Sequence, residues 1–229
     1  MKSIAIIPGK RESRRCPNKN TRNFLGRPIV EWTIEAARES RCFDSIILVS
    51  DIVDWASYVD GVVGWWSNFD MANDGFTVVQ VCEEIMKKYC SADFFTCLLP
   101  TAPMRTGGDI HDAFRLLDEM KADGVMGVTK YVQPWWQALD IDNRKLTPMF
   151  PNIVDLRENE STAIIGEKYV DNGSMYVMRT RVFLKEKTFY VKRLHGHLMP
   201  YERSIDINTE TDFEVTEFLA KKIYKFSEK

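Results

Sequence analysis

Four short apolar runs, separated by segments with helical periodicity, constrain the fold of this chain more than any other feature. The runs are SIAII, SIILVS, DFFTCLL and GVMGVTKYV, at residues 3–7, 45–50, 93–99 and 124–132. Continuous β-branched and aromatic runs of this length are typical of strands buried on both faces of a parallel sheet. The intervening segments PIVEWTIEAARES, TVVQVCEEIMKKY and DIHDAFRLLDEM carry apolar residues at helical spacing. This alternation predicts an α/β fold with a mostly parallel central sheet.

The rhythm changes after about residue 132, which predicts an insertion at 133–170 within a single domain spanning 1–229. The stretch WWQALDIDNRKLTPMF indicates a hairpin with Asp142 and Asn143 at its turn. Strand character returns at NGSMYVMRT and again near 190–199, and a helix closes the chain in ETDFEVTEFLAKKIYKF, with Thr209 and Asp212 spaced as a capping box. The insertion carries apolar residues with little core to join, so we expect a homodimer through Trp135, Trp136, Ile153, Ile164 and Ile165.

Composition excludes several classes of protein. The chain has 31 Lys and Arg residues against 33 Asp and Glu residues, so it lacks the basic excess of a nucleic-acid-binding protein. The amino-terminal apolar run is too short for a signal sequence or a membrane span. The five cysteines form no CxxC pair and their number is odd, which argues against a disulfide framework. We therefore expect a cytoplasmic protein that binds neither membrane nor nucleic acid.

A basic loop follows the first apolar run, in IAIIPGKRESRRCPNKN at residues 4–20. Its five cations, Lys10, Arg11, Arg14, Arg15 and Lys19, repel one another unless an anion binds them. Because the loop leaves the end of a predicted strand, its cations and backbone amides are expected over the carboxyl edge of the sheet, where a polyphosphate can bind. A solvated basic loop is the alternative, since the loop has neither a P-loop nor a GxGxxG pattern.

Three further motifs could complete a site at this edge. In RSIDINTETDF, Asp206 and Asn208 would share one face of an extended strand and approach one magnesium ion, although an Asx turn before a helix is the alternative. In LLPTAPMRT, two prolines stiffen a loop that brings Arg105 toward the same edge, unless the loop is only a rigid turn. In YVDNGSMYV, the residues Asp171, Asn172 and Gly173 could hydrogen-bond a polyol or form an ordinary turn.

With these motifs in order, the chain resembles the acylneuraminate cytidylyltransferases, the family that includes the CMP-sialic-acid synthetases and relatives that act on pseudaminic and legionaminic acids. Residues 7–20 are similar to the family pattern I-P-A-R-x-G-S-K-R-x-P-x-K-N without gaps. Four more blocks follow in the family order and extend the resemblance over nearly the whole chain: FLGRPIVEWTIEAARES, LLPTAPMR, YVDNGSMYV and ERSIDINTETDF.

The resemblance implies a Rossmann-like nucleotidyltransferase fold with an inserted dimerisation segment, CTP and a keto sugar acid as substrates, Mg²⁺ as cofactor and a homodimer. It implies catalytic roles for Lys19, Asp206 and Arg14, and metal binding by Asp206 and Asn208. The implied nucleotide contacts are Pro8, Gly9, Lys10, Ser13, Arg14, Lys19, Asn20, Asp74, Thr77 and Pro100. The implied sugar contacts are Thr101, Arg105, Asn172 and Gly173, with Arg157 reaching the neighbouring subunit's sugar.

The chain also departs from the family pattern at several of these positions. Lys10 replaces an arginine, Arg11 and Glu12 stand where glycines are usual, Leu99 replaces a glutamine and Asn208 replaces an aspartate. The arginine usually found before L-A-x-D has no counterpart. Two alternatives therefore remain open: a nucleotidyltransferase for another sugar or nucleotide, and a divergent nucleotide-binding homologue with weak catalysis.

Overall fold

A mixed seven-stranded sheet forms the centre of the computed structural model, which describes residues 1–10, 13, 15–50, 65–66, 76–133, 135–150 and 166–224. Across these residues the strand order is β11-β7-β10-β6-β1-β4-β5. Neighbouring strands are parallel except where β10 runs antiparallel to β6 and β7, so the prediction of a mostly parallel α/β sheet is confirmed. The strands are β1 (Ser3–Pro8), β4 (Ser45–Val49), β5 (Trp65–Trp66), β6 (Phe94–Leu98), β7 (Gly124–Lys130), β10 (Tyr169–Arg179) and β11 (Leu194–Leu198).

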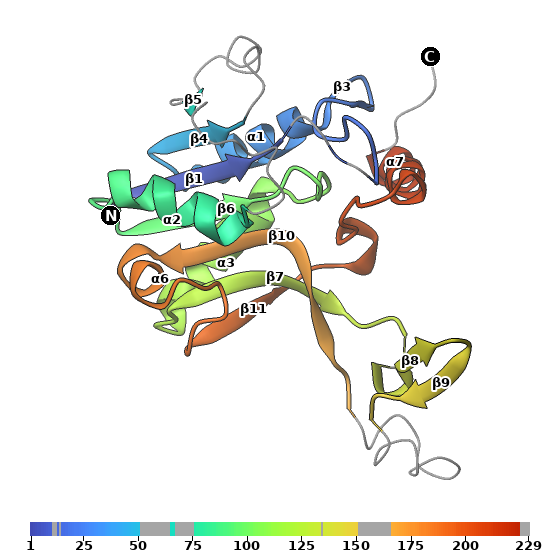
Figure 1. Ribbon diagram of the computed structural model, residues 1–229. Coiled ribbons are helices and arrows are strands. Elements are labelled where there is room, and N and C mark those ends of the chain that lie inside the picture. Colours follow the sequence, from blue (N-terminus) through green and yellow to red (C-terminus); the bar gives the residue numbers. More distant parts are fainter. Residues whose placement is uncertain are drawn as a thin grey trace.

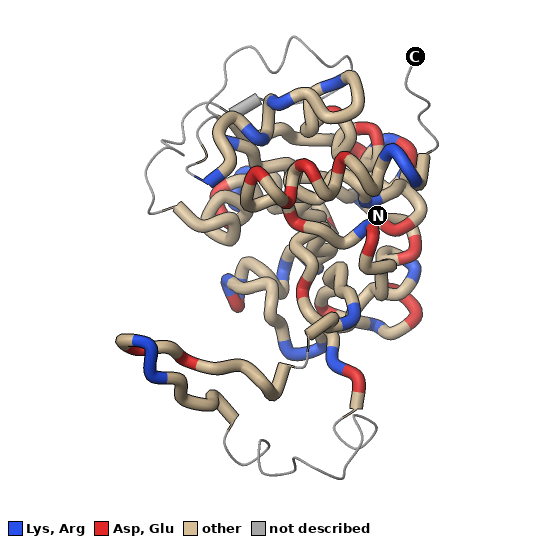
Figure 2. Tube along the Cα trace, turned by 90° about the vertical axis from the view of Figure 1, so that its right-hand side faces the viewer, with Lys and Arg blue, Asp and Glu red and all other residues tan. Residues whose placement is uncertain are grey.

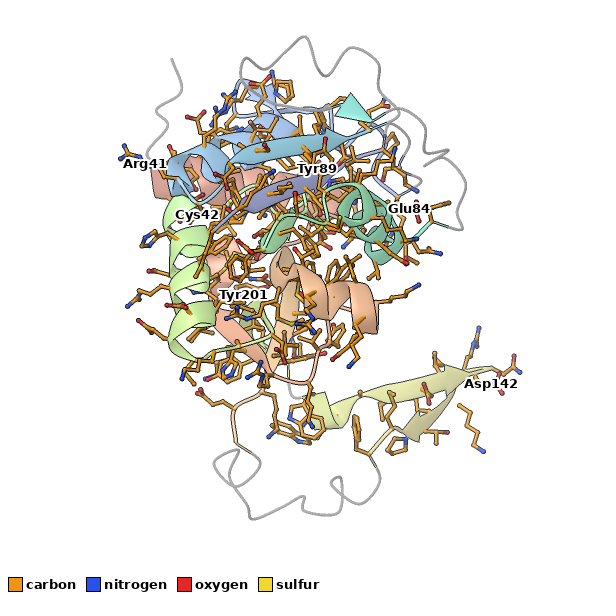
Figure 3. All side chains as sticks on the ribbon, turned by 90° about the vertical axis from the view of Figure 1, so that its left-hand side faces the viewer. Arg41, Cys42, Glu84, Tyr89, Asp142 and Tyr201 are labelled. Carbon is orange, nitrogen blue, oxygen red and sulfur yellow. The ribbon has the colours of Figure 1, made fainter. Side chains whose placement is uncertain are left out.

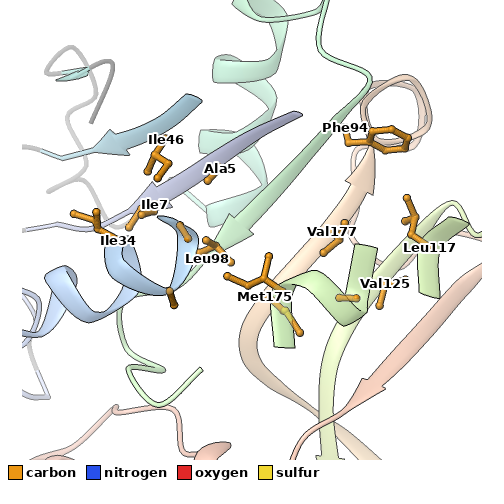
Figure 4. Close-up of a cluster of buried hydrophobic side chains, with 14 of the residues drawn as sticks. Ala5, Ile7, Ile34, Ile46, Phe94, Leu98, Leu117, Val125, Met175 and Val177 are labelled. Carbon is orange, nitrogen blue, oxygen red and sulfur yellow. The ribbon is translucent and has the colours of Figure 1, made fainter. Parts of the chain in front are cut away.

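Helices cover both faces of this sheet and produce three layers (Figure 1). Helices α1 (Ile29–Ser40) and α3 (Gly107–Glu119) pack on one face, and α2 (Val78–Lys88) and α6 (Thr180–Glu186) pack on the other. Each face has its own apolar cluster, because strands between two helical layers bury alternate side chains on opposite sides. Figure 4 shows the first cluster, in which Ile34 of α1 and Leu117 of α3 lie against side chains of five strands.

Local sequence signals fix where the helices begin. Thr77 and Gln80 form a capping box at the start of α2, and Thr106 and Asp109 form one at the start of α3. The closing helix α7 (Glu210–Tyr224) starts after Thr209, whose Oγ1 accepts from the Asp212 backbone amide at 3.2 Å. The predicted cap at this helix is therefore confirmed. None of the helices in the described ranges is long and apolar enough to cross a membrane.

Three local predictions differ from the structure. Asp171, Asn172 and Gly173 lie inside the long strand β10, at a register shift, rather than in a turn before a strand. Asp206 lies in an irregular segment that follows the short 3-10 helix η3 (Tyr201–Arg203), not in a strand. The turn of the predicted hairpin is shifted by one residue to Asn143 and Arg144, which both have positive φ, as a two-residue turn between twisted strands requires.

That hairpin stands apart from the central sheet. Its strands β8 (Leu139–Asp142) and β9 (Lys145–Pro148) form a separate two-stranded sheet, preceded by the 3-10 helix η2 (Trp135–Gln137), and Figure 3 shows Asp142 at its tip, away from the main body. Another small sheet joins β2 (Asn23–Phe24) to β3 (Arg27–Pro28) before α1. Basic and acidic residues are interspersed along most of the described elements (Figure 2), so the charge of the basic loop is a local feature.

Candidate active site

A pocket of about 370 Å³ opens beside the adjacent strands β1 and β6, within the volume range of small-molecule sites. Loops that follow two neighbouring parallel strands meet at this edge, and the start of α2 and the segment before α7 close its other sides. Predicted site residues that line it are Pro8, Gly9, Lys10, Lys19, Asn20, Thr77, Pro100, Thr101, Asp206 and Asn208. The structure thus gathers three separate sequence motifs around one cavity, together with Thr77 before α2.

The base of the basic loop is fixed to the sheet. Gly9 donates its backbone amide to the Val49 carbonyl at 2.9 Å, which continues the pairing of β1 with β4. Asn20 donates its side-chain Nδ2 to the Lys10 carbonyl at 2.8 Å and so ties the two ends of the loop together. The Asn20 side-chain Oδ1 is buried and has no hydrogen-bond partner among the described residues, which leaves an acceptor in the pocket wall for a ligand donor.

Lys19 lies near the end of the basic loop, and its ammonium group contacts the segment that carries Asp206. Its Nζ donates to the Ile207 carbonyl at 2.7 Å. Burial lowers the pKa of Lys19, and the nearby Asp206 carboxylate acts in the opposite direction. A partly buried cation with few water contacts interacts more strongly with phosphate than a solvated one does.

Asp206 faces the loop from the carboxyl-terminal part of the chain. Asn208 donates its Nδ2 to Asp206 Oδ2 at 2.6 Å, whereas Asp206 Oδ1 is buried without a hydrogen-bond partner among the described residues. Gly173 lies against this carboxylate: it has a φ of 65°, and a Cβ added there would lie 3.4 Å from Asp206 Cγ. A buried carboxylate oxygen without a partner, beside a cationic pocket, fits a magnesium ion that keeps waters and substrate phosphate as its other ligands.

Two predicted sugar contacts are corrected by the structure. Arg105 is only 2% exposed, does not line the pocket, and donates to the carbonyls of Leu99 and Ser174. Burial lowers the pKa of Arg105 to about 10, so the guanidinium is still charged near neutral pH. Its position within hydrogen-bonding reach of both backbone segments shows that it joins the loop after β6 to β10 instead of presenting a cation to the pocket.

Asn172 is the second correction, because its side-chain amide is fully engaged inside the protein. Its Nδ2 donates to Ser204 Oγ at 3.0 Å and to the Met199 sulfur, and its Oδ1 accepts from the backbone and hydroxyl of Ser174. Gly127 makes room for this network, since a Cβ there would lie 2.1 Å from Ser174 Oγ. Asn172 therefore stabilises the protein interior next to the site and does not present its amide to the pocket.

The remaining predicted residues do not line the pocket or lie outside the described residues. Ser13 is half-buried but is not among the pocket-lining residues, and Gly173 acts through its contact with Asp206. Arg14, Asp74 and Arg157 lie outside the described residues.

Sequence reasoning missed the apolar wall formed by Phe76, Val78 and Val81 beside Leu99. The spacing of Val78 and Val81, one helical turn apart directly after the predicted contact Thr77, is the signal that could have indicated this wall.

An ion network anchors the segment that leads to Asp206. Asp109, buried at the start of α3, accepts from both terminal nitrogens of Arg203, contacts His197 Nε2 at 3.3 Å and accepts from the Thr106 amide at 2.8 Å. Burial acts to raise the pKa of Asp109, but the hydrogen bonds from His197, Arg203 and Thr106 outweigh it and hold the pKa well below its ordinary value.

Asp109→Asn is expected to lower the free energy of unfolding at pH 7 by about 3 kcal/mol, because it leaves Arg203 without its buried partner. A carboxylate whose folded-state pKa is lowered stabilises the fold above its unfolded pKa of about 4 and loses this contribution as the pH falls further. Urea unfolding at pH 7 and pH 3 measures this: the difference between wild type and variant should shrink at pH 3. A difference that is equal at both pH values would contradict the ionic role.

Cations on the loop after the first strand face the Asp206 carboxylate across this pocket, which is the arrangement of a nucleotidyltransferase. The chain is an enzyme of this class. Residues 4–61 match the model of the family described as Cytidylyltransferase.

Similar proteins of known activity cover almost the whole chain. CMP-N,N'-diacetyllegionaminic acid synthase of Legionella pneumophila is 29% identical over 229 residues, with 96% of each chain covered. Pseudaminic acid cytidylyltransferase of Campylobacter jejuni is 25% identical, with 96% of this chain and 97% of the relative covered. N-acylneuraminate cytidylyltransferase of Escherichia coli is 26% identical over 93% of this chain but only 51% of the relative, so this chain spans about half of that protein.

Solved structures show the same fold at lower sequence identity. CMP:2-keto-3-deoxy-manno-octonic acid synthetase complexed with CTP has a TM-score of 0.67 and 14% identity, and 97% of this chain and all of that chain are covered. The 4-diphosphocytidyl-2C-methyl-D-erythritol synthase of Anaerococcus prevotii has a TM-score of 0.64 and 14% identity over 95% of this chain and 98% of that chain. These similarities establish the nucleotidyltransferase fold.

Proposed function

We propose that this enzyme transfers CMP from CTP to the anomeric hydroxyl of a nonulosonic keto sugar acid and releases pyrophosphate. The observation that carries the proposal is the pocket in which Lys10 and Lys19 face Asp206. The relatives that cover the chain from end to end support this acceptor class, because their names specify legionaminic and pseudaminic acids.

The reaction needs positioning and charge stabilisation more than covalent catalysis. The anomeric oxygen forms a bond to the α-phosphorus of CTP while the bond from that phosphorus to pyrophosphate breaks, so negative charge grows on the leaving group. Fixed cations stabilise this charge without reorganising, and alignment of the two substrates removes much of the entropic barrier. Lys19 is held for this role by the Ile207 carbonyl, and Lys10 by the loop closure at Asn20.

Asp206 is the residue that would hold Mg²⁺, through its buried Oδ1, which has no hydrogen-bond partner among the described residues. Within the described residues there is no group of three His, Cys, Asp or Glu side chains that could hold a metal alone, so substrate phosphates and waters would supply the other ligands. When bound, the ion supplies positive charge to the phosphates. Asp206 itself places a carboxylate opposite the loop cations, and a residue larger than glycine at position 173 would bring its Cβ within 3.4 Å of Asp206 Cγ.

A panel of acceptors tests the proposed activity. The protein with CTP and Mg²⁺ should release pyrophosphate on addition of sialic, pseudaminic or legionaminic acid, and should show a clear preference within the panel. Each reaction without acceptor measures background hydrolysis. If folded protein released no pyrophosphate with any nonulosonic acid, the proposal would be wrong.

A different acceptor or nucleotide is the second candidate function, and Leu99 is the observation that favours it. Leu99 lines the pocket where the family pattern has a glutamine, so one hydrogen-bonding contact to a sugar or base is replaced by apolar surface. The test adds 3-deoxy-octulosonate and hexose phosphates to the panel and compares CTP, UTP, GTP and ATP by thermal shift. The preferred nucleotide should stabilise the fold most, because it binds the native state selectively.

The hairpin β8–β9 supports a homodimer as part of this proposal. Leu139, Ile141 and Leu146 lie on one face of the hairpin and are exposed, with Ile141 at 70% and Leu146 at 56%. An isolated two-stranded hairpin is marginally stable in water, and an exposed apolar face on it marks a contact surface. A second copy of the chain would cover this face.

Ile141→Lys with Leu146→Lys is expected to convert a wild-type dimer into a monomer, because two cross-strand neighbours would place charges in the interface. Sedimentation at micromolar concentration measures the mass, and Thr147→Lys, an exposed position on the other face of β9, is the matched control. A wild type that sediments as a monomer, or a double variant that remains dimeric, would contradict the hairpin's role.

A further inference from the structure

The side-chain amide of Asn208 has an orientation that its two partners determine. Its Nδ2 donates to Asp206 Oδ2 at 2.6 Å, and its Oδ1 accepts from Arg15 Nη2 at 2.9 Å. An ionised carboxylate only accepts hydrogen bonds and a guanidinium only donates them. Exchanging the amide oxygen and nitrogen would therefore break both contacts at once, so the arrangement admits one orientation of Asn208.

This orientation is unsuitable for a metal ligand shared with Asp206. The amide turns its nitrogen, which cannot ligate a cation, toward the carboxylate, and its oxygen is bound to a positive charge. A magnesium ion between the two side chains would require the amide to rotate, lose Arg15 and bring two oxygens together. The sequence-based prediction that Asn208 is a second ligand does not agree with this geometry.

The same contacts leave Asp206 with one free oxygen. Asn208 occupies Oδ2, a Cβ added at Gly173 would lie 3.4 Å from the carboxylate carbon, and Oδ1 is buried without a partner among the described residues. Lys19 is bound to the carbonyl of Ile207, between the two side chains in sequence, and so fixes the backbone that carries both. The Asn208 bond therefore restricts how the carboxylate can turn, and the Lys19 bond restricts the backbone that carries it.

The geometry points to Asn208 as a positioning residue: it orients Asp206 so that Oδ1 alone is available to a cation, and Arg15 sets the orientation of its amide. This inference rests on the proposed function, since it concerns the residue assigned to hold Mg²⁺. It assigns a role to Arg15 other than direct phosphate contact. It also explains how an asparagine can stand at this position without supplying a metal ligand.

Nuclear magnetic resonance of the Asn208 side-chain amide tests the inference without any turnover. The Asn208→Asp spectrum identifies the amide signals by their absence. In the metal-free wild type, the amide proton bonded to Asp206 should be shifted downfield and exchange slowly with water. Arg15→Met should abolish this protection, whereas Arg115→Met, an exposed arginine on α3, should leave it unchanged. Protection that survives Arg15→Met would overturn the role of Arg15.

Addition of Mg²⁺, alone and with CTP, separates a positioning residue from a ligand. The amide protection should persist when Mg²⁺ binds, because Asn208 keeps its bond to Asp206. Loss of protection together with a changed amide shift would show that the oxygen has turned to the metal, and the inference would be wrong. The metal-free arms do not depend on substrate, so failure of the pyrophosphate assay with these arms intact would reject only the proposed function.

Discussion

Asp206→Asn is expected to reduce the turnover number by about 10³-fold, a loss of about 4 kcal/mol of transition-state stabilisation. The substitution keeps the size of the side chain and its contact with Gly173 but removes the charge assigned to hold Mg²⁺. Pyrophosphate release at saturating CTP and acceptor measures the effect. Circular dichroism and thermal unfolding should show that the variant still folds.

The control for this prediction is Asp118→Asn, which removes an exposed carboxylate on α3 and should leave turnover unchanged. Binding of CTP without metal should also be nearly equal in wild type and Asp206→Asn, because the proposed phosphate contacts come from Lys10 and Lys19. Turnover of Asp206→Asn within about tenfold of the wild type would be too small a loss for a carboxylate that holds the metal.

Lys19→Met should lower turnover by about 10²- to 10³-fold, the range measured when one fixed donor to a developing negative charge is removed. Its effect on stability should be small. Burial lowers the pKa of Lys19, which means that the folded protein disfavours its charged form. The free energy gained by removing this charge offsets the free energy lost with the hydrogen bond to the Ile207 carbonyl. Kinetics with CTP and thermal unfolding measure the two effects, and Lys192→Met, at an exposed position, is the control.

The pH dependence of kcat/KM for CTP provides a second test of Lys19. The ammonium group is charged below its pKa, so activity should fall as the pH rises through that value, which burial places below the usual range for lysine. Lys19→Arg keeps the charge to higher pH and should move the alkaline limb of the profile upward. An identical alkaline limb in both proteins would show that Lys19 does not supply the charge.

Much of the fold and the outline of the site were predictable because they depend on local patterns. The runs that form β1, β4, β6 and β7 are continuous and apolar, and the capping residues Thr209 and Asp212 lie three positions apart. The carboxyl ends of neighbouring parallel strands also meet at one edge of a sheet. The positions of Pro8 and Pro100, each directly after an apolar run, therefore indicate that both residues line the same pocket.

The roles of individual polar side chains were less predictable, because their partners are distant in the sequence. Arg15 reaches Asn208 over 193 positions, and Asn172 reaches Ser204 over 32 positions. A motif shows which polar groups are present but not which of them are already satisfied inside the protein. Asn172 was therefore predicted as a ligand contact although its amide is satisfied inside the protein, and Arg105 was predicted as one although it is buried and its Nη1 donates to two backbone carbonyls.

Direct detection of the product tests the central claim most clearly. The wild type is incubated with CTP, Mg²⁺ and each nonulosonic acid, and ³¹P spectra and product mass are recorded beside those of Asp206→Asn and Lys19→Met. A phosphodiester that joins CMP to the sugar, formed with equimolar pyrophosphate by the wild type and strongly reduced in both variants, is the predicted result. Folded wild type that binds CTP but forms no such product with any acid, or variants as active as the wild type, would contradict the account.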